Sequence, residues 1–136
     1  MKVHVDKQNI EPIYGMANFK EKITGEKFDL WVDEVGSDRN VVHNLPRFKP
    51  KANGVQLDIV LNPNGDAEIV NADSKKIQKF RYAKEAIAFI ERFRKPLMMH
   101  WNGEIETTEL GNIIRLVVKK NYTIDNAITS VLNDEY

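Results

Sequence analysis

The chain contains no cysteine, which excludes disulfide bonds, thiolate metal sites, iron–sulfur clusters and cysteine nucleophiles. No apolar run comes near the roughly 20 residues needed to cross a bilayer, and the first residues contain no signal-peptide hydrophobic region. Net charge is also missing, since 20 basic residues balance 20 acidic ones, so the whole molecule has no general attraction to nucleic acid. We therefore expect a cytoplasmic protein in a reducing compartment.

The common phosphate-binding loops and the nucleophile elbow are absent as well. Neither G-x-G-x-x-G nor G-x-x-x-x-G-K-[ST] occurs, and G-x-S-x-G does not occur either. We therefore expect no cofactor.

The length and composition are those of one folded domain. The chain has 136 residues, of which 42% are hydrophobic and 29% are charged, and a chain of this length buries about two-thirds of its unfolded surface. We predict a single domain over residues 1–136, strand-rich in residues 1–71 and helical in residues 73–136.

Two hairpins are predicted in the first half. Residues 16–23 and 27–35 flank Gly25, and in the second of these segments hydrophobic and polar residues alternate, as in a sheet that is buried on one side. Residues 55–61 and 66–70 flank Asn62-Pro63-Asn64-Gly65, a strong turn sequence. Both pairs indicate antiparallel strands.

The second half has helical periodicity. Asp73 or Ser74 can cap a helix that runs to about Lys95, where Pro96 should break or kink it before a short helix over residues 96–102. Further helices are expected from Thr107 or Thr108, and after the cap Thr123, because apolar residues recur there at spacings of three and four.

Together these elements predict an α+β fold, with an antiparallel twisted sheet of four to five strands followed by helices packed on one face. The helix beginning near residue 73 should cross the apolar face of the sheet. The expected core consists of Phe28, Leu30, Val32, Leu57, Ile59, Ile69, Ile87, Ile90 and Phe93.

A basic segment at residues 39–51 is the main candidate for contact with a partner. Pro46 and Pro50 remove ladder donors, so any strand here is expected at a sheet edge. Arginine and aromatic side chains on such an edge are typical contact residues, whereas the alternative is a solvated edge whose charges discourage aggregation. The candidate partner-binding residues are Arg39, His43, Pro46, Arg47, Phe48, Lys49 and Lys51.

Charge is unevenly distributed in the helical half. Residues 72–100 contain eight Lys/Arg and three Asp/Glu, whereas residues 101–136 contain three and six. The basic helix face adds to the candidate contact surface, although two solvated faces that attract each other would give the same pattern. The last helix has no Lys or Arg from residue 121 to residue 136, so direct binding of nucleic acid has little support.

Metal-dependent hydrolysis is the enzymatic alternative. Asp29 and Asp33 share a strand face, and His43 follows in the next segment, so these three could hold a metal ion. A nuclease pair of Asp58 and Glu68 lacks the lysine that normally follows in such sites.

Residues 43–49 (HNLPRFK) are followed by the Asn-Gly hairpin, by the predicted helix and by residues 97–102 (LMMHWN). In this order, over about residues 27–102, the chain resembles a small uncharacterised bacterial family, some of whose genes lie near toxin–antitoxin or mobile-element genes. That family has a strand written H-x-P-P-H-x-H, then a hairpin, then a helix ending in a Leu-Leu-x-x-Trp-like element. Leu45 replaces the first proline, and Arg47 and Lys49 replace the later histidines, so only His43 of a metal motif is retained.

We therefore expect a non-enzymatic bacterial or mobile-element protein that binds another macromolecule, most plausibly a protein. One form of this function is an inhibitor or regulator of a nucleic-acid enzyme. The metal-dependent hydrolase or nuclease stays open as the alternative, and the pattern says nothing of the oligomeric state.

Overall fold

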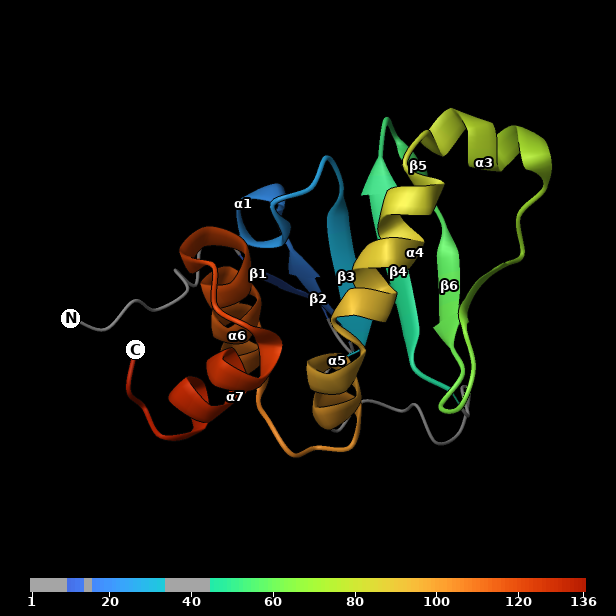
Figure 1. The fold of residues 1–136 in the computed structure, drawn as a ribbon. Helices are drawn as coiled ribbons and strands as arrows, with labels where there is room; N and C mark the ends of the chain where they lie inside the picture. The colour runs from blue at the N-terminus through green and yellow to red at the C-terminus, as the bar shows by residue number, and fades with distance from the viewer. Residues whose placement is uncertain (1–9, 14–15, 34–44) are drawn as a thin grey trace.

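The computed structural model describes residues 10–13, 16–33 and 45–136, in which most of the strands precede most of the helices (Figure 1). The strands are β1 (Ile10–Ile13), β2 (Met16–Phe19), β3 (Asp29–Asp33), β4 (Arg47–Ala52), β5 (Val55–Gln56), β6 (Asp58–Leu61) and β7 (Ala67–Val70). The helices are α1 (Glu21–Thr24), α3 (Ser74–Phe80), α4 (Ala83–Arg92), α5 (Arg94–Trp101), α6 (Thr107–Lys120) and α7 (Ile124–Leu132). The predicted α+β class is confirmed.

The described strands form one antiparallel sheet in the order β1-β2-β3-β4-β6-β7, and β5 pairs with β4. Both predicted strand pairings are present, as β2 with β3 and as β6 with β7. The predicted strand over residues 55–61 is divided at Leu57 into β5 and β6, and β1 is an additional strand that the sequence pattern did not predict.

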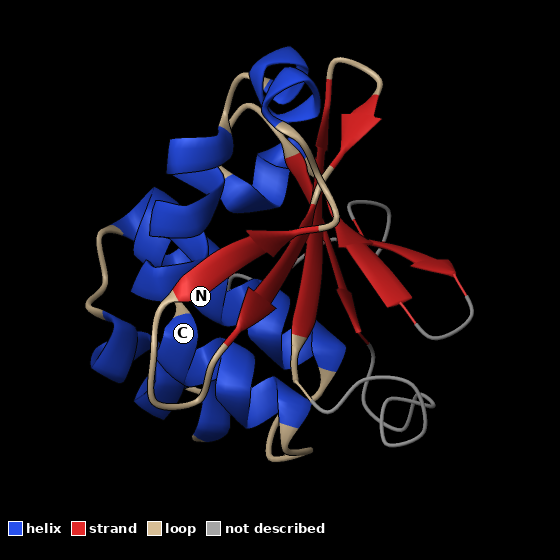
Figure 2. Ribbon diagram, turned by 90° about the vertical axis from the view of Figure 1, so that its right-hand side faces the viewer, coloured by secondary structure: helices blue, strands red, loops and turns tan. Residues whose placement is uncertain are grey.

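The helices lie on one side of the sheet, as Figure 2 shows. Strand residues that face them alternate with residues on the open face, so Leu30 and Val32 are buried while Asp29, Trp31 and Asp33 are half-buried. The strands and helices share one hydrophobic core. Of the predicted core residues, Ile69 and Ile87 are half-buried and pack against this core, and the other seven are buried.

The position of β4 corrects the expectation of an edge. This strand lies inside the sheet, with β3 on one side and β6 on the other. Pro46, Phe48 and Pro50 alternate onto the helix side and are buried, whereas Arg47 and Lys49 are half-buried on the open face. The segment therefore has the period of a half-buried strand.

Pro50 within β4 and Pro46 directly before it both turn their carbonyl groups toward the neighbouring residues Leu57 and Leu61. The backbone N–H of Leu57 donates to the carbonyl of Pro50 (3.0 Å), and that of Leu61 donates to the carbonyl of Pro46 (3.1 Å). Neither proline has an N–H to return the bond. The pair formed by Leu57 and Pro50 is consequently half made, which explains why the ladder is interrupted between β5 and β6.

The first predicted hairpin has a helical turn between its strands. The strand predicted to reach residue 23 ends at Phe19, and α1 follows before β3 begins. The carboxylate of Asp29 accepts the backbone N–H of Glu21 (3.1 Å), which ties the first turn of α1 to β3. Gly25 ends α1 with a φ of 71°, the left-handed conformation that glycine adopts at low cost.

The long helix predicted from residue 73 to about residue 95 is divided into parts. Asp73 caps α3 as predicted, since its side chain accepts the N–H of Lys76 (2.8 Å). The helix then ends at Arg81, which adopts a φ of 76°, and α4 begins at Ala83. A second break at Phe93 precedes Pro96, which lies inside the first turn of α5 where a missing N–H costs nothing.

The C-terminal helices agree with the pattern. Glu106 and Glu109 form a capping box at the start of α6, and the Thr123 hydroxyl accepts the N–H of Asn126 at the start of α7. Within the described residues, no helix is long and apolar enough to cross a bilayer.

Candidate partner-binding groove

The structure separates the predicted contact residues into different environments. Arg39 and His43 lie outside the described residues. Pro46 is buried, and the side chain of Phe48 is 1% exposed within the core, so the expectation that Phe48 stands outside the fold is wrong. Pro46 and Phe48 face the helices, because successive side chains along a strand point to opposite faces of the sheet.

The remaining cations of this segment lie on the open face of the sheet. Arg47 and Lys49 are half-buried, and Lys51 is exposed. Lys49 lies opposite Trp31 of β3 and forms an ion pair with Asp58 of β6 at 3.8 Å. A half-exposed pair of this kind contributes about 0.2–1 kcal/mol, so it holds Lys49 only loosely.

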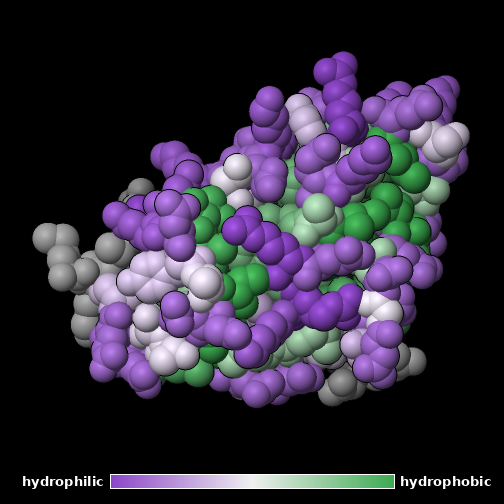
Figure 3. All heavy atoms as spheres, viewed as in Figure 1, coloured by the Kyte–Doolittle hydropathy of each residue, from purple (hydrophilic) through white to green (hydrophobic). Residues whose placement is uncertain are grey.

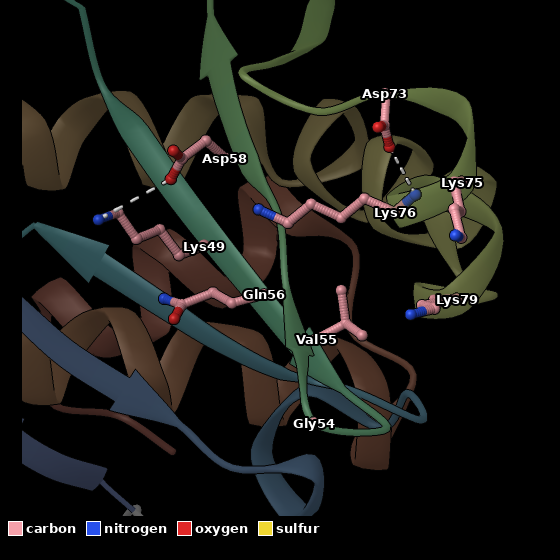
Figure 4. A pocket seen from close by; sticks show the side chains of 9 residues that line it. All are labelled: Lys49, Gly54, Val55, Gln56, Asp58, Asp73, Lys75, Lys76 and Lys79. Carbon is pink, nitrogen blue, oxygen red and sulfur yellow. Dashed lines mark hydrogen bonds and ion pairs between the residues drawn. The ribbon is translucent and has the colours of Figure 1, made fainter.

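An open groove connects this face with α3. Its volume is about 640 Å³, within the range of clefts that hold ligands. We call it the basic groove, and its lining consists of Lys49, Gly54, Val55, Gln56, Asp58, Asp73, Lys75, Lys76 and Lys79 (Figure 4). It therefore joins Lys49, from the predicted basic segment, to three lysines of the predicted basic helix.

Contacts at its C-terminal end hold α3 beside the sheet. At its start, Asp73 caps the helix as described above. At its end, Phe80 is fully buried and packs on Phe28, directly before β3, with 6.2 Å between the ring centroids. The Asn53 side-chain amide donates to the carbonyl of Phe80 (3.3 Å), which joins the end of α3 to the turn between β4 and β5.

Left-handed backbone conformations at a turn and at the end of β7 flank the space between β5 and α3. Asn53 and Gly54 have φ values of 55° and 73°, the pair of positive φ values that a type I′ hairpin turn requires. Asn71 has a φ of 58° directly after β7. The chain leaves the sheet there, so β7 ends opposite Asp58 and does not continue beside β5. The Asn-Gly turn signal was present in the sequence and was missed.

A second hollow adjoins the basic groove along α3. Its lining includes Asn53, Gln78 and Arg81 together with Lys75 and Lys79, which belong to both. Arg81 adopts its left-handed conformation where a glycine is usual, and this costs an L-residue about 1–2 kcal/mol. Arg81, which carries this conformational cost, also adds its positive charge to the same surface.

The lysines of α3 are exposed, and their positive charge is little neutralised by acidic side chains. Among the described residues, no acidic side chain forms an ion pair with Lys75, Lys76 or Lys79. Lys75 and Lys79 are four residues apart, a like-charge spacing that weakens a helix by about 0.2–0.5 kcal/mol. The two aspartates of the groove are already engaged, Asp58 by Lys49 and Asp73 by the helix cap.

The pictures show the same arrangement. In Figure 4 the side chain of Lys76 extends from α3 toward the sheet, while Lys75 and Lys79 stay on the helix side. In Figure 3, hydrophilic side chains gather at the upper right, where α3 lies, and hydrophobic atoms are visible between the helices below. The surface around α3 is therefore hydrophilic, and the lysines of α3 that line the groove give it positive charge.

Among the described residues, the structure adds no set of metal ligands in support of the enzymatic alternative. Within the described ranges, which leave out His43, no group of three or more His, Cys, Asp and Glu residues is placed to hold a metal ion. The Asp29 carboxylate already holds α1 and lies 3.6 Å from the Lys20 amino group. Asp29 thus has a structural role beside any other.

A shifted carboxyl group lies elsewhere on the molecule. Burial raises the pKa of Glu26, and the Glu85 carboxylate adds to this, while Arg92 opposes it. A raised carboxyl pKa costs stability above that pKa and costs none once the pH falls below the ordinary value. Glu26 does not line the basic groove, so we assign it no part in binding.

Comparison of this chain with protein-family models, curated proteins and solved structures finds no match.

Proposed function

We propose that this protein is a non-enzymatic bacterial or mobile-element protein, acting in the cytoplasm, that binds another macromolecule through the basic groove. The observation that carries the proposal is the meeting of Lys49 with Lys75, Lys76 and Lys79 around one open groove. Cations from two elements far apart in sequence, with few carboxylates left to neutralise them, favour a partner that carries negative charge.

A protein with an acidic surface fits this groove better than a nucleic acid. Among the described residues, the lining has no aromatic side chain on which a base could stack, and its cations are lysines rather than the forked guanidinium of arginine. An inhibitor or regulator of a nucleic-acid enzyme is one form of this function. Its target would then carry an acidic surface patch that resembles nucleic acid in charge.

Charge reversal on α3 tests this proposal without weakening the fold. The first turn of α3 contains no acidic residue, so Lys75→Glu with Lys76→Glu adds negative charge where the helix dipole favours it. We expect the double variant to keep its thermal stability and to recover at least about tenfold less partner in a quantitative pull-down, equivalent to about 1.4 kcal/mol of binding free energy.

The matched control reverses two exposed lysines that do not line the basic groove. Lys22→Glu with Lys27→Glu changes the net charge by the same amount, within α1 and three residues after it. This control should recover partner like the unmodified protein. Equal recovery with the α3 double variant would remove the proposal, and equal loss with both variants would reduce it to a general charge effect.

A further inference from the structure

The basic groove contains a short strand edge that no other described strand pairs with, although α3 lies close to it. β7 pairs with β6 from Asp58 to Leu61, and β5 continues beyond the end of β7. Of the strands in the described part of the chain, only β4 pairs with β5. The outer edge of β5 therefore faces the groove between the sheet and α3.

The hydrogen-bonding phase of the strand identifies the residue that faces outward. Leu57 and Leu61 donate their N–H groups to β4, and backbone groups alternate direction along a strand. The N–H and C=O of Gln56 consequently point away from β4, into the basic groove. An extended segment laid beside β5 would find one donor and one acceptor there.

The other edge of the sheet at β7 is less suitable for such pairing. The backbone N–H of Ala67 points away from β6, and it already donates to the Glu91 carboxylate (3.2 Å). Arg94 donates to the carbonyls of Asn62 and Gly65 in the adjoining turn. Side chains thus engage the start of β7 and its turn, whereas β5 is flanked by lysines.

We propose that the basic groove takes an extended acidic segment of a partner protein, which pairs with β5 through Gln56 as an added strand. This inference rests on the proposed function and names the chemistry of the partner. Alternate side chains of an added strand point to opposite faces. Carboxylates on the face of the segment toward α3 can meet Lys75 and Lys76, and the other side chains lie toward the open face of the sheet.

A defined probe tests the pairing directly. The probe is a fluorescein-labelled peptide of alternating Glu and Thr, because threonine favours extended structure, and the control peptide replaces each Glu with Gln. Fluorescence anisotropy should show binding of the Glu peptide that weakens with added salt, and no binding of the Gln peptide. Lys75→Glu with Lys76→Glu should weaken binding at least about tenfold.

Substitution at Gln56 separates backbone pairing from simple attraction of charges. Gln56→Pro removes the outward N–H while leaving the bonds between β5 and β4 intact, and proline is accepted at such an edge. We expect Gln56→Pro to weaken binding about fivefold, the loss of one hydrogen bond, and Gln56→Ala to change it less than twofold. A peptide N-methylated at alternate residues in the matching register tests the same bonds from the partner's side if the proline variant does not fold.

Each result has a stated meaning. Unchanged binding by Gln56→Pro or by the N-methylated peptide would overturn strand pairing, and absence of binding by the Glu peptide would overturn the acidic segment. Binding of single-stranded or duplex DNA of equal charge more tightly than the peptide would assign the groove to nucleic acid. In all these cases the α3 double variant can still lose its partner in the pull-down, so the proposed function can stand when this inference fails.

Discussion

Phe48→Ala is expected to lower the free energy of unfolding by about 3–5 kcal/mol, the range for removing a buried phenylalanine side chain. The side chain is 1% exposed, and its residue lies between Val32 of β3 and Ile59 of β6 in the middle of the sheet. Small domains unfold at about 5–15 kcal/mol, so this loss removes a large part of the total. Urea unfolding measured at equilibrium gives the value.

The neighbouring residue provides the control for Phe48. Lys49→Ala, on the opposite face of the same strand, removes a half-exposed ion pair with Asp58 and should cost no more than about 1 kcal/mol. A loss below about 1 kcal/mol for Phe48→Ala, together with weaker partner binding, would return Phe48 to the surface and contradict the placement of β4.

Gly25→Ala is expected to destabilise the protein by about 2–5 kcal/mol. The left-handed φ of 71° costs an alanine about 1–2 kcal/mol. A Cβ at this position would also overlap Cγ1 of Val118 in α6, and a β-branched side chain in a helix has little freedom to turn away. Overpacking of this kind adds about 1–3 kcal/mol. Thermal or urea unfolding measures the sum.

Gly54→Ala separates the two contributions. Gly54 has a similar φ of 73°, but no heavy atom lies within 4 Å of the added Cβ, so only the conformational cost of about 1–2 kcal/mol applies. Combining Gly25→Ala with Val118→Ala should cost less than the sum of the two single changes, because the overlap is gone. Equal losses for Gly25→Ala and Gly54→Ala would show that α1 does not pack against α6 as the structure has it.

The parts of the fold with clear periodicity could be predicted from the sequence. Alternation in residues 28–32 and the turn around Gly65 placed β3 and the pair of β6 with β7. Spacings of three and four, with Thr123 as a cap, placed α6 and α7. In these segments local conformation and burial favour the same structure, so tertiary contacts had no reason to override the pattern.

The segment around β4 was misread because its prolines were given more weight than its alternation. Pro46, Phe48 and Pro50 alternate with Arg47 and Lys49, which is the period of a strand buried on one side. A proline leaves a strand pair without one N–H donor, and the pairs with Leu57 and Leu61 here each lack one. Both prolines here turn toward the same neighbour, and sequence alone does not show which edge that is.

The break between α3 and α4 has no glycine or proline to mark it. Phe80 and Ala83 continue the apolar spacing through Arg81, so periodicity predicted one helix. The contacts that favour the break are tertiary, namely Phe80 on Phe28 and the Asn53 amide on the Phe80 carbonyl. The groove depends on this break and on Asn71, and so its lysines could be named as basic beforehand but not placed beside β5.

Backbone amide signals of the isotopically labelled protein, followed by NMR during titration with the Glu–Thr peptide, test the binding groove most directly. Our account predicts that the largest shifts occur at Gly54, Val55 and Gln56 and along α3, and that the Gln56 amide becomes protected from solvent exchange at saturation. Shifts centred on Trp31 and Arg47 with Gln56 unaffected, or an unchanged spectrum at saturating peptide, would contradict it.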